Sequence, residues 1–272
     1  MEKWTMDETQ LIRELYPVCN AKEISEKLGK SINSIRSKAH RMGLRNPCHS
    51  CDTDYFNAID SSDKAYWVGF ITADGYVVNS SEHRDYELGI ELSKCDAAHL
   101  KKFLDCIHSD SEVQFRKRQN FAGYGVDKEY EECLIRIYSK KMVESLAQYG
   151  IVQNKTYSLR NTNVPQQYMW DYIRGYFDGD GSLSLSKVST SRAVHSYPRI
   201  SFVCKNKEFL LDIQSFLDKE DIHSDIYQDR TYWEMFIRRH DSVSKFLHSI
   251  YSTENSIRLD RKYEKYKAFF LN

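Results

Sequence analysis

The chain has 272 residues, of which 41% are hydrophobic and 29% are charged, enough apolar material for one large domain or two to three smaller ones. Lysine plus arginine equals aspartate plus glutamate at 39 each, so any attraction to nucleic acid must come from local patches. Seven scattered cysteines fit a reducing compartment, and the lack of a long apolar run or leader pattern argues against membrane spans and secretion. We therefore expect a cytoplasmic protein without membrane contacts.

The N-terminal part of the chain predicts three short helices. The first begins at a capping box of Thr5 and Glu8 and stops before Pro17. The second ends at Gly29, a residue type that favours a left-handed helix cap, and the third follows over about residues 31–42. Two short helices joined at a glycine turn are typical of a helix-turn-helix.

The same region concentrates positive charge in an otherwise neutral chain. Between Lys27 and Arg45 there are six lysines and arginines and no acidic residue, which is the pattern expected for phosphate contacts. The segment resembles small helix-turn-helix units of phage and bacterial DNA-binding proteins, although a generic three-helix bundle or a protein adaptor stays an alternative. On the third helix, the residues predicted to contact DNA are Asn33, Ser34, Arg36 and Lys38.

A longer pattern then occurs twice, about a hundred residues apart. The first copy begins "AYWVGFITADGYVV" and the second "DYIRGYFDGDGSLSLS", and in both a glycine is followed four residues later by a small residue and then by Asp-Gly. Each copy continues with two strands, a helix, two strands and a helix, as judged by hydrophobic periodicity. We therefore predict an α+β fold with two pseudo-twofold-related αββαββα repeats. The predicted parts are a helix-turn-helix unit (1–46), a linker (47–62), a first repeat (63–158) and a second repeat (159–272).

The aspartates of the two copies are predicted to meet. Small residues four apart, such as Gly69 and Ala73, lie on one helical face, and with Gly175 in the second copy they would let two helices approach closely. Asp74 and Asp180 would then sit together at helix C-termini, where the macrodipole costs each carboxylate about 0.3–1 kcal/mol and the two charges repel. A hard divalent cation removes this penalty. For either copy alone, an Asp-Gly hairpin turn stays an alternative.

These motifs resemble a known family. "WVGFITADG" and "IRGYFDGDG" are similar to the paired signatures of the LAGLIDADG homing endonucleases, in which the last aspartate of each motif binds the catalytic metals, here Asp74 and Asp180. The likeness extends from about Tyr55 to the C-terminus. It implies a monomer with internal pseudo-twofold symmetry that cleaves both strands of DNA with Mg²⁺ or Mn²⁺, whereas Ca²⁺ should support binding without cleavage.

Two residues depart from the signature pattern. Thr72 stands where the second copy has Asp178, so Asp178 is not expected to be a metal ligand. Arg174 lies inside the second signature helix, and we expect its charged head to reach the helix edge and leave the interface small.

The resemblance also implies polar and basic residues around the metals. By the expected strand register, Glu91 and Ser201 would occupy a position that orders water. Lys140, and less surely Arg238 or Arg239, would supply a positive charge that stabilises the phosphorane-like transition state. The alternative for each of these residues is a solvated polar group at a strand end.

The strand faces are expected to read DNA, because two-stranded ribbons can enter the major groove and arginine commonly contacts guanine there. Some of these residues would contact only phosphates. The candidates are Gln114, Arg116 and Arg118 near the first sheet and Arg192, Arg199, Lys205 and Lys207 near the second.

The leading hypothesis is therefore a site-specific, metal-dependent DNA endonuclease from an intron or phage mobile element. A free-standing enzyme fits better than an intein, because Met1 begins the chain and no histidine precedes Asn272. The first alternative is a catalytically silent DNA-binding regulator, against which the presence of both Asp74 and Asp180 argues. An RNA splicing cofactor is the second alternative.

Overall fold

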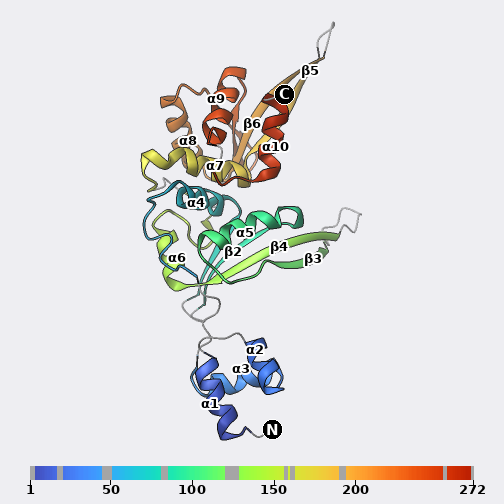
Figure 1. Cartoon of the computed structure of the whole chain (residues 1–272). Coiled ribbons are helices and arrows are strands. Elements are labelled where there is room, and N and C mark those ends of the chain that lie inside the picture. Colours follow the sequence, from blue (N-terminus) through green and yellow to red (C-terminus); the bar gives the residue numbers. More distant parts are fainter. Residues whose placement is uncertain are drawn as a thin grey trace. The chain divides into compact units, whose positions relative to one another are not determined.

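A computed structural model divides the chain into two compact units, Met1–Ser50 and Cys51–Asn272 (Figure 1). No helix among the described residues is long and apolar enough to cross a membrane. The structure describes residues 4–16, 21–44, 51–80, 85–119, 129–155, 159, 163–189, 194–253 and 256–270.

The described part of the N-terminal unit contains the three predicted helices, α1 (Met6–Leu15), α2 (Ala21–Leu28) and α3 (Ile32–Arg41). The capping box is present, since the Glu8 amide donates to Thr5 Oγ1 at 3.1 Å and the Thr5 amide to Glu8 Oε2 at 2.9 Å. Gly29 follows α2 with φ of 63°, the left-handed conformation expected at a helix end. The core of the unit consists of Ile12, Tyr16, Ala21, Ile24, Ile35 and Ala39.

The larger unit contains the predicted duplication and has an α+β fold. Its described strands form two four-stranded antiparallel sheets, in the orders β1-β2-β4-β3 and β5-β6-β8-β7. The first repeat consists of α4 (Ser62–Asp74), β1 (Gly75–Ser80), β2 (Asp85–Ser93), α5 (Ala97–Cys106), β3 (Gln114–Gln119), β4 (Glu129–Tyr138) and α6 (Lys140–Ala147). The second repeat consists of α7 (Met169–Asp180), β5 (Ser182–Ser189), β6 (Val194–Cys204), α8 (Lys207–Lys219), β7 (Asp225–Asp229), β8 (Tyr232–Ile237) and α9 (His240–Tyr251), followed by α10 (Asp260–Phe270).

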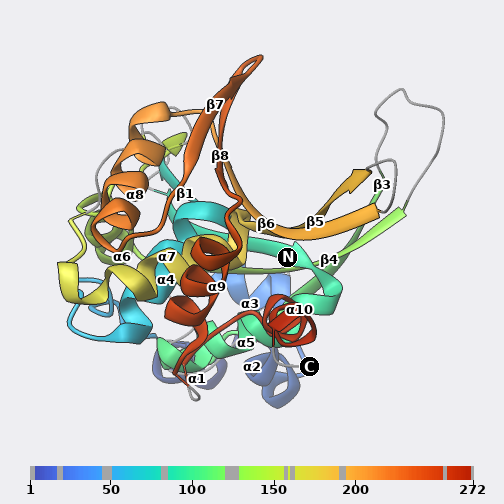
Figure 2. The same cartoon turned by 90° about the horizontal axis from the view of Figure 1, so that it is seen from above.

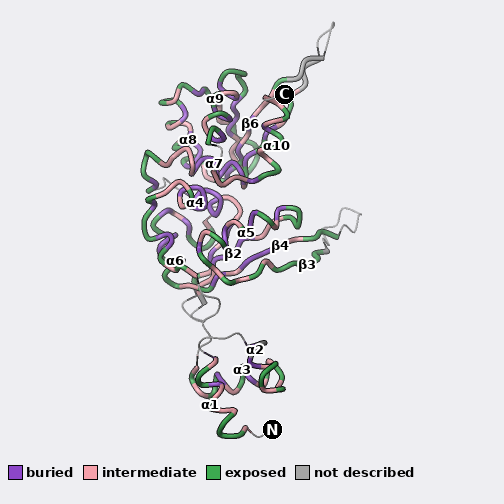
Figure 3. Tube along the Cα trace, viewed as in Figure 1, coloured by how far each residue is buried: buried purple, intermediate pink, exposed green. Residues whose placement is uncertain are grey.

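The two signature helices, α4 and α7, lie side by side between the repeats (Figure 1). A Cβ atom on Gly69 would overlap the carbonyl of Tyr172, and one on Gly175 would overlap the carbonyl of Tyr66. The helix backbones are therefore in direct contact, as the glycine spacing predicted. Burial is continuous over residues 65–72 of α4 and 172–178 of α7 (Figure 3).

Each sheet has one face packed on helices and one open face. In β4, Cys133, Ile135 and Ile137 are buried, whereas Glu132 and Tyr138 lie on the opposite face. Figure 2 shows the helices of the larger unit gathered on one side and the strands curving along the other. Part of the predicted linker belongs to this unit, since Tyr55, Phe56 and Ile59 are buried in its core.

Candidate active site

The two signature aspartates end the paired helices. Asp74 is the last residue of α4 and Asp180 the last of α7, and each is followed directly by a glycine that begins or precedes a strand. These glycines, Gly75 and Gly181, have extended conformations with φ of −83° and −71°. The chain therefore turns from helix to strand in one step, which holds each aspartate at the start of its sheet.

The carboxylates of Asp74 and Asp180 lie close enough to repel each other. Gly179 packs against Asp74, since a Cβ atom on this glycine would lie 3.2 Å from Asp74 Oδ2. Desolvation, followed by the charge of Asp180, raises the pKa of Asp74 to about 6. Desolvation by the surrounding protein also raises the pKa of Asp180, although part of this residue is open to solvent. The fold thus maintains two unfavourably placed carboxylates side by side.

Two lysines face the ends of the signature helices. Lys155, which follows the last helix of the first repeat, donates a hydrogen bond from Nζ to the carbonyl of Gly75. Lys262, which follows the last helix of the second repeat, donates to the carbonyls of Phe177 at 2.6 Å, Gly179 at 2.9 Å and Gly181 at 2.5 Å. Positive charge at a helix C-terminus is favourable because of the macrodipole.

Both lysines are electrostatically coupled to the aspartates. Desolvation lowers the pKa of Lys155 and lowers that of Lys262 to about 8, while Asp74 and Asp180 oppose these shifts. Lys155 also lines a hollow of about 270 Å³ that opens beside Asp180, together with Thr72, Tyr176, Cys204 and Tyr232. The sequence motifs predicted no role for these lysines. The only available signal was their place in the segments "YGIVQNKTYSL" and "SIRLDRKYEKYKAF", which contribute to the family resemblance.

The expected register of Glu91 and Ser201 is wrong. Gly75 pairs with Ile90, so Glu91 lies one residue beyond this pair. In the second repeat Ser182 pairs with Ser201, which makes Ser201 the counterpart of Gly89. Glu91 and Ser201 are therefore two positions apart rather than equivalent. Glu91 accepts a hydrogen bond from Arg116 Nη2 at 2.5 Å instead of standing free to order water.

The basic residues predicted to support the site make their contacts elsewhere. Lys140 lies at the start of α6, where its Nζ is 3.5 Å from Glu144 Oε1. Arg238 donates to Tyr227 Oη at 3.0 Å and packs over the ring of Phe236, and Arg239 is the exposed residue that precedes α9. Within the described chain, the lysines whose charges act on Asp74 and Asp180 are Lys155 and Lys262 rather than Lys140 and Arg238.

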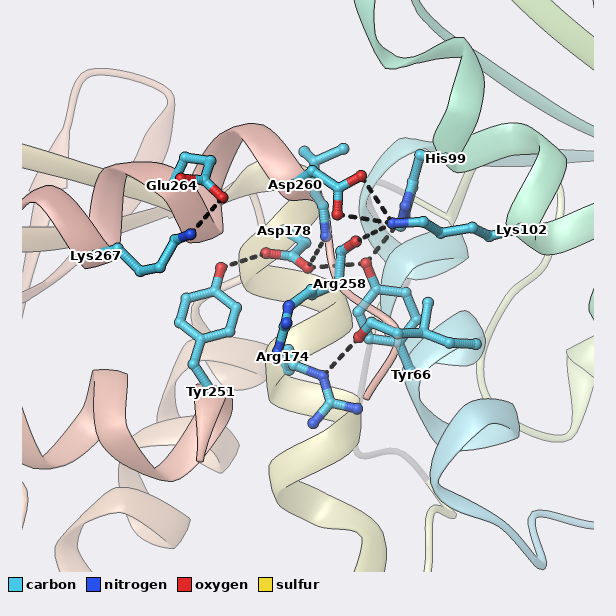
Figure 4. Close-up of polar contacts among 12 residues, drawn as sticks. Tyr66, His99, Lys102, Arg174, Asp178, Tyr251, Arg258, Asp260, Glu264 and Lys267 are labelled. Atoms are coloured by element: carbon cyan, nitrogen blue, oxygen red, sulfur yellow. Dashed lines mark hydrogen bonds and ion pairs between the residues drawn. The ribbon is translucent and has the colours of Figure 1, made fainter. Parts of the chain in front are cut away.

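The environments of Asp178 and Arg174 are only partly as expected. Asp178 is fully buried and accepts hydrogen bonds from Tyr251 Oη at 2.6 Å, the Leu259 amide at 2.7 Å and Tyr66 Oη at 2.8 Å (Figure 4). Burial raises the pKa of Asp178, and these hydrogen bonds oppose the shift. Arg174, whose head was expected to reach the helix edge and leave the interface small, is only 3% exposed and forms an ion pair with Asp171 at 2.8 Å.

The residues predicted to read DNA lie mostly on open surfaces. Gln114, Arg116 and Arg118 share one face of β3 with their β4 partners Leu134, Glu132 and Tyr130, opposite the buried Cys133, Ile135 and Ile137. Arg116 is held by two glutamates, Glu91 and Glu132, at 2.5 and 2.9 Å. In the second repeat Arg199 packs over Phe236, Lys207 packs over Trp233 and Lys205 is exposed, while Arg192 lies outside the described residues.

The N-terminal unit carries its polar face on α3. Asn33 and Arg36 are exposed and Ser34 is half-buried, whereas Lys38 packs over the ring of Trp4 and is less available for contacts. Arg36 borders a shallow hollow of about 580 Å³, lined also by Tyr16, Ser37, His40, Arg41 and Leu44. Polar and positively charged groups therefore surround an open concave surface on this unit.

The aspartate pair fits a hard divalent cation. Among the described residues there is no group of three or more histidine, cysteine, aspartate or glutamate side chains that could hold a metal by itself. Mg²⁺ does not need such a group, because it is commonly bound by one or two carboxylates together with water and substrate phosphates. Asp74 and Asp180 offer oxygen ligands only, and a bound cation would relieve the repulsion between them.

Asp74→Asn should stabilise the metal-free protein at pH 8. The pKa of Asp74 in the folded protein, about 6, lies above its ordinary value of 3.8, so folding favours the protonated form. Wild-type stability should therefore rise as the pH falls through 6 towards 4, and the advantage of the asparagine variant should vanish there. Since Asp74 is partly exposed, we expect a difference of only about 1 kcal/mol at pH 8.

Thermal unfolding in EDTA between pH 5 and pH 8 measures this difference. Asp221→Asn is a suitable control, because this carboxylate is 94% exposed and lies outside the site. An Asp74→Asn variant that is no more stable than the wild type at pH 8 would contradict the unfavourable placement of the Asp74 charge.

Comparison with known proteins supports the assignment of the fold. Residues 167–251 match the family model of the LAGLIDADG-like domain. The structure is similar to that of the homing endonuclease I-WcaI bound to its DNA recognition sequence, with a TM-score of 0.55 and 14% identity over 77% of this chain and 89% of that one. It is also similar to the meganuclease I-SmaMI bound to uncleaveable DNA, with a TM-score of 0.51 and 13% identity over 78% and 88% of the two chains.

No curated protein matches the sequence. The matched domain model covers most of the second repeat, and the similar structures cover about three quarters of the chain. At 13–14% identity, these structures establish the fold rather than the activity. Residues 167–251 of the second repeat therefore match the LAGLIDADG-like domain, and the larger unit has the fold of the similar homing endonucleases.

Proposed function

We propose that the chain is a site-specific DNA endonuclease that hydrolyses both strands of a duplex with a divalent cation held by Asp74 and Asp180. The observation that carries this proposal is the pair of carboxylates at adjacent helix ends, where desolvation disfavours both charges and the charge of Asp180 further disfavours that of Asp74. A sequence selected for stability alone would not place two acids there, so the arrangement points to a functional site. The DNA-bound state of the structurally similar meganucleases supports a duplex as the substrate.

The residues around the pair suggest how they would take part in hydrolysis. A bound Mg²⁺ or Mn²⁺ would activate water and polarise the phosphodiester. Asp74 and Asp180 would orient this cation, and Lys155 would place an ammonium group where negative charge develops on the phosphate. Among the described residues Lys155 donates one hydrogen bond to the protein, so it keeps two N–H groups for substrate.

The open faces of the two sheets would bind the duplex on either side of the aspartates. Arg116 is the strongest candidate for base recognition, because Glu91 and Glu132 fix the orientation of its guanidinium before DNA binds. The other candidates would supply polar or phosphate contacts. They are Gln114, Arg118, Arg199, Lys205 and Lys207, to which Arg192 is added from the sequence alone.

Asp74→Asn and Asp180→Asn should each abolish strand cleavage while leaving duplex binding in Ca²⁺ measurable. The amide keeps the shape of the side chain but removes the charge that holds the cation. The test requires a duplex recovered from a randomised plasmid pool by cleavage with the wild-type protein and Mg²⁺. Normal cleavage by either variant would show that the metal assignment is wrong, whereas tight binding without cleavage by the wild type would favour a DNA-binding regulator.

Lys155→Met should slow cleavage of the recovered duplex by about 100-fold, because loss of one preorganised donor at the developing charge typically costs this much. The affinity for the duplex in Ca²⁺ should change little. Lys140→Met is the matched control, since Lys140 is an exposed lysine that pairs with Glu144. Equal rates for the Lys155 and Lys140 variants would remove Lys155 from the reaction.

The N-terminal unit should add phosphate contacts outside the core target. Replacing both Arg36 and Arg41 by glutamine should weaken duplex binding and reduce the slope of log affinity against log salt by about 2, because each phosphate contact contributes about 0.9. Arg13→Gln, an exposed arginine on α1, serves as the control. Binding titrations of the full chain at several salt concentrations measure the slope. An unchanged slope would mean that these arginines do not contact DNA.

A further inference from the structure

The segment that leads from α9 into the first turn of α10 is held by side chains from both repeats. We call residues 256–262 the C-terminal connector. Arg174 Nε donates to the Ile257 carbonyl at 2.9 Å, and the Leu259 amide donates to Asp178 Oδ2 at 2.7 Å. These two anchors come from the second signature helix, α7, whose end carries Asp180.

The first repeat supplies further anchors for the C-terminal connector. Lys102 Nζ on α5 donates to the Arg258 carbonyl at 3.0 Å and to the Asp260 carboxylate at 2.8 Å (Figure 4). Arg261 pairs with Asp96, at the start of α5, at 3.0 Å. Each residue from 257 to 261 is thus bound by a side chain of another element, which is far more than a linker between two helices requires.

The C-terminal connector places Lys262 beside the end of α7. A lysine ammonium group has three N–H donors, and within the described chain those of Lys262 go to the carbonyls of Phe177, Gly179 and Gly181. With all of its donors used, Lys262 has none left for a phosphate. Lys262 instead binds the carbonyls of Gly179 and Gly181, the residues immediately before and after Asp180.

The described part of the first repeat lacks this arrangement. Thr72, the counterpart of Asp178, donates its hydroxyl to the Val68 carbonyl of its own helix. Lys155 binds only the Gly75 carbonyl among the described residues, although its charge lies near the same aspartates. Both helix ends therefore have a lysine nearby. Among the described residues, the lysine at the end of α7 binds three backbone carbonyls and the lysine at the end of α4 binds one.

We infer that Asp178 and the C-terminal connector form a positioning device for the metal ligand Asp180. Asp178 holds the connector, the connector places Lys262, and Lys262 fixes the backbone on both sides of Asp180. The metal step of this inference rests on the proposed function. The inference assigns to the buried acid of the second signature a role that differs from metal binding, and to Lys262 a role that differs from that of Lys155.

The affinity for a cation distinguishes the positioning of Asp180 by Lys262 from a direct effect of the lysine charge. Loss of a lysine charge beside two carboxylates should by itself strengthen cation binding. Lys155→Met tests this effect, because it removes the same charge and only one carbonyl contact. Lys262→Met should instead weaken binding of Ca²⁺ by about ten-fold, since a loosely held ligand must be ordered when the cation binds. Calorimetric titration of the full-length variants with Ca²⁺ measures both.

Proteolysis tests the connector without any metal. Trypsin cleaves after Arg258, Arg261 and Lys262, and cleavage requires local opening of the connector. Asp178→Thr, which introduces the residue of the first repeat, should accelerate cleavage at these sites by about ten-fold or more in EDTA, as expected for loss of a hydrogen bond to a charged group. Tyr251→Phe is the matched control, because it removes a hydrogen bond from Asp178 Oδ1 but keeps the Leu259 contact at Oδ2.

Lys102→Met provides a second variant that should fold, since its side chain is 34% exposed. It should also accelerate tryptic cleavage of the connector, and mass spectrometry identifies the sites. The inference is wrong if Asp178→Thr and Tyr251→Phe are cleaved at the same rate, or if Lys262→Met binds Ca²⁺ as tightly as the wild type or more tightly. Failure of the proposed function would differ, because the wild-type protein would then bind no cation while the connector stayed protected.

Discussion

The backbone contact between α4 and α7 is the constraint on which the other features of the larger unit depend. Gly69 and Gly175 leave no room for a side chain between the helices, so the two C-terminal helix ends must come together. The aspartates that end them, Asp74 and Asp180, are then neighbours whatever their charge. The strands begin directly after these residues, so the same contact also sets the sheets on either side of the carboxylates.

The contact and the carboxylate pair could be predicted because their signal is local and occurs twice. Glycine spacing and a helix-ending aspartate are visible within ten residues of sequence. Lys155 and Lys262 could not be predicted in this way, because they act across the fold from segments outside the repeated pattern. A single sequence does not show which distant lysine will reach a helix end.

The error in register has a different cause. Side chains alternate between the two faces of a strand with a period of two, so a shift by two residues leaves every side chain on its correct face. Ser201 corresponds to Gly89 rather than to Glu91, which is such a shift. The alternating pattern therefore predicted the open face of each sheet correctly, including Arg116 on β3, without fixing the equivalence of individual positions.

Buried polar groups explain why the repeats are similar but unequal. The interior position of the second signature holds Asp178, a charge that becomes tolerable only because Tyr66, Tyr251 and the Leu259 amide all donate to it. Thr72 in the first signature satisfies its hydroxyl within its own helix and needs no partner elsewhere. The buried Asp178 thus binds α7 to a distant segment, whereas the Thr72 hydroxyl donates within α4. Because both signatures lie on one chain, each can change separately. The two helices can therefore end in the same aspartate although different hydrogen bonds hold their interior positions.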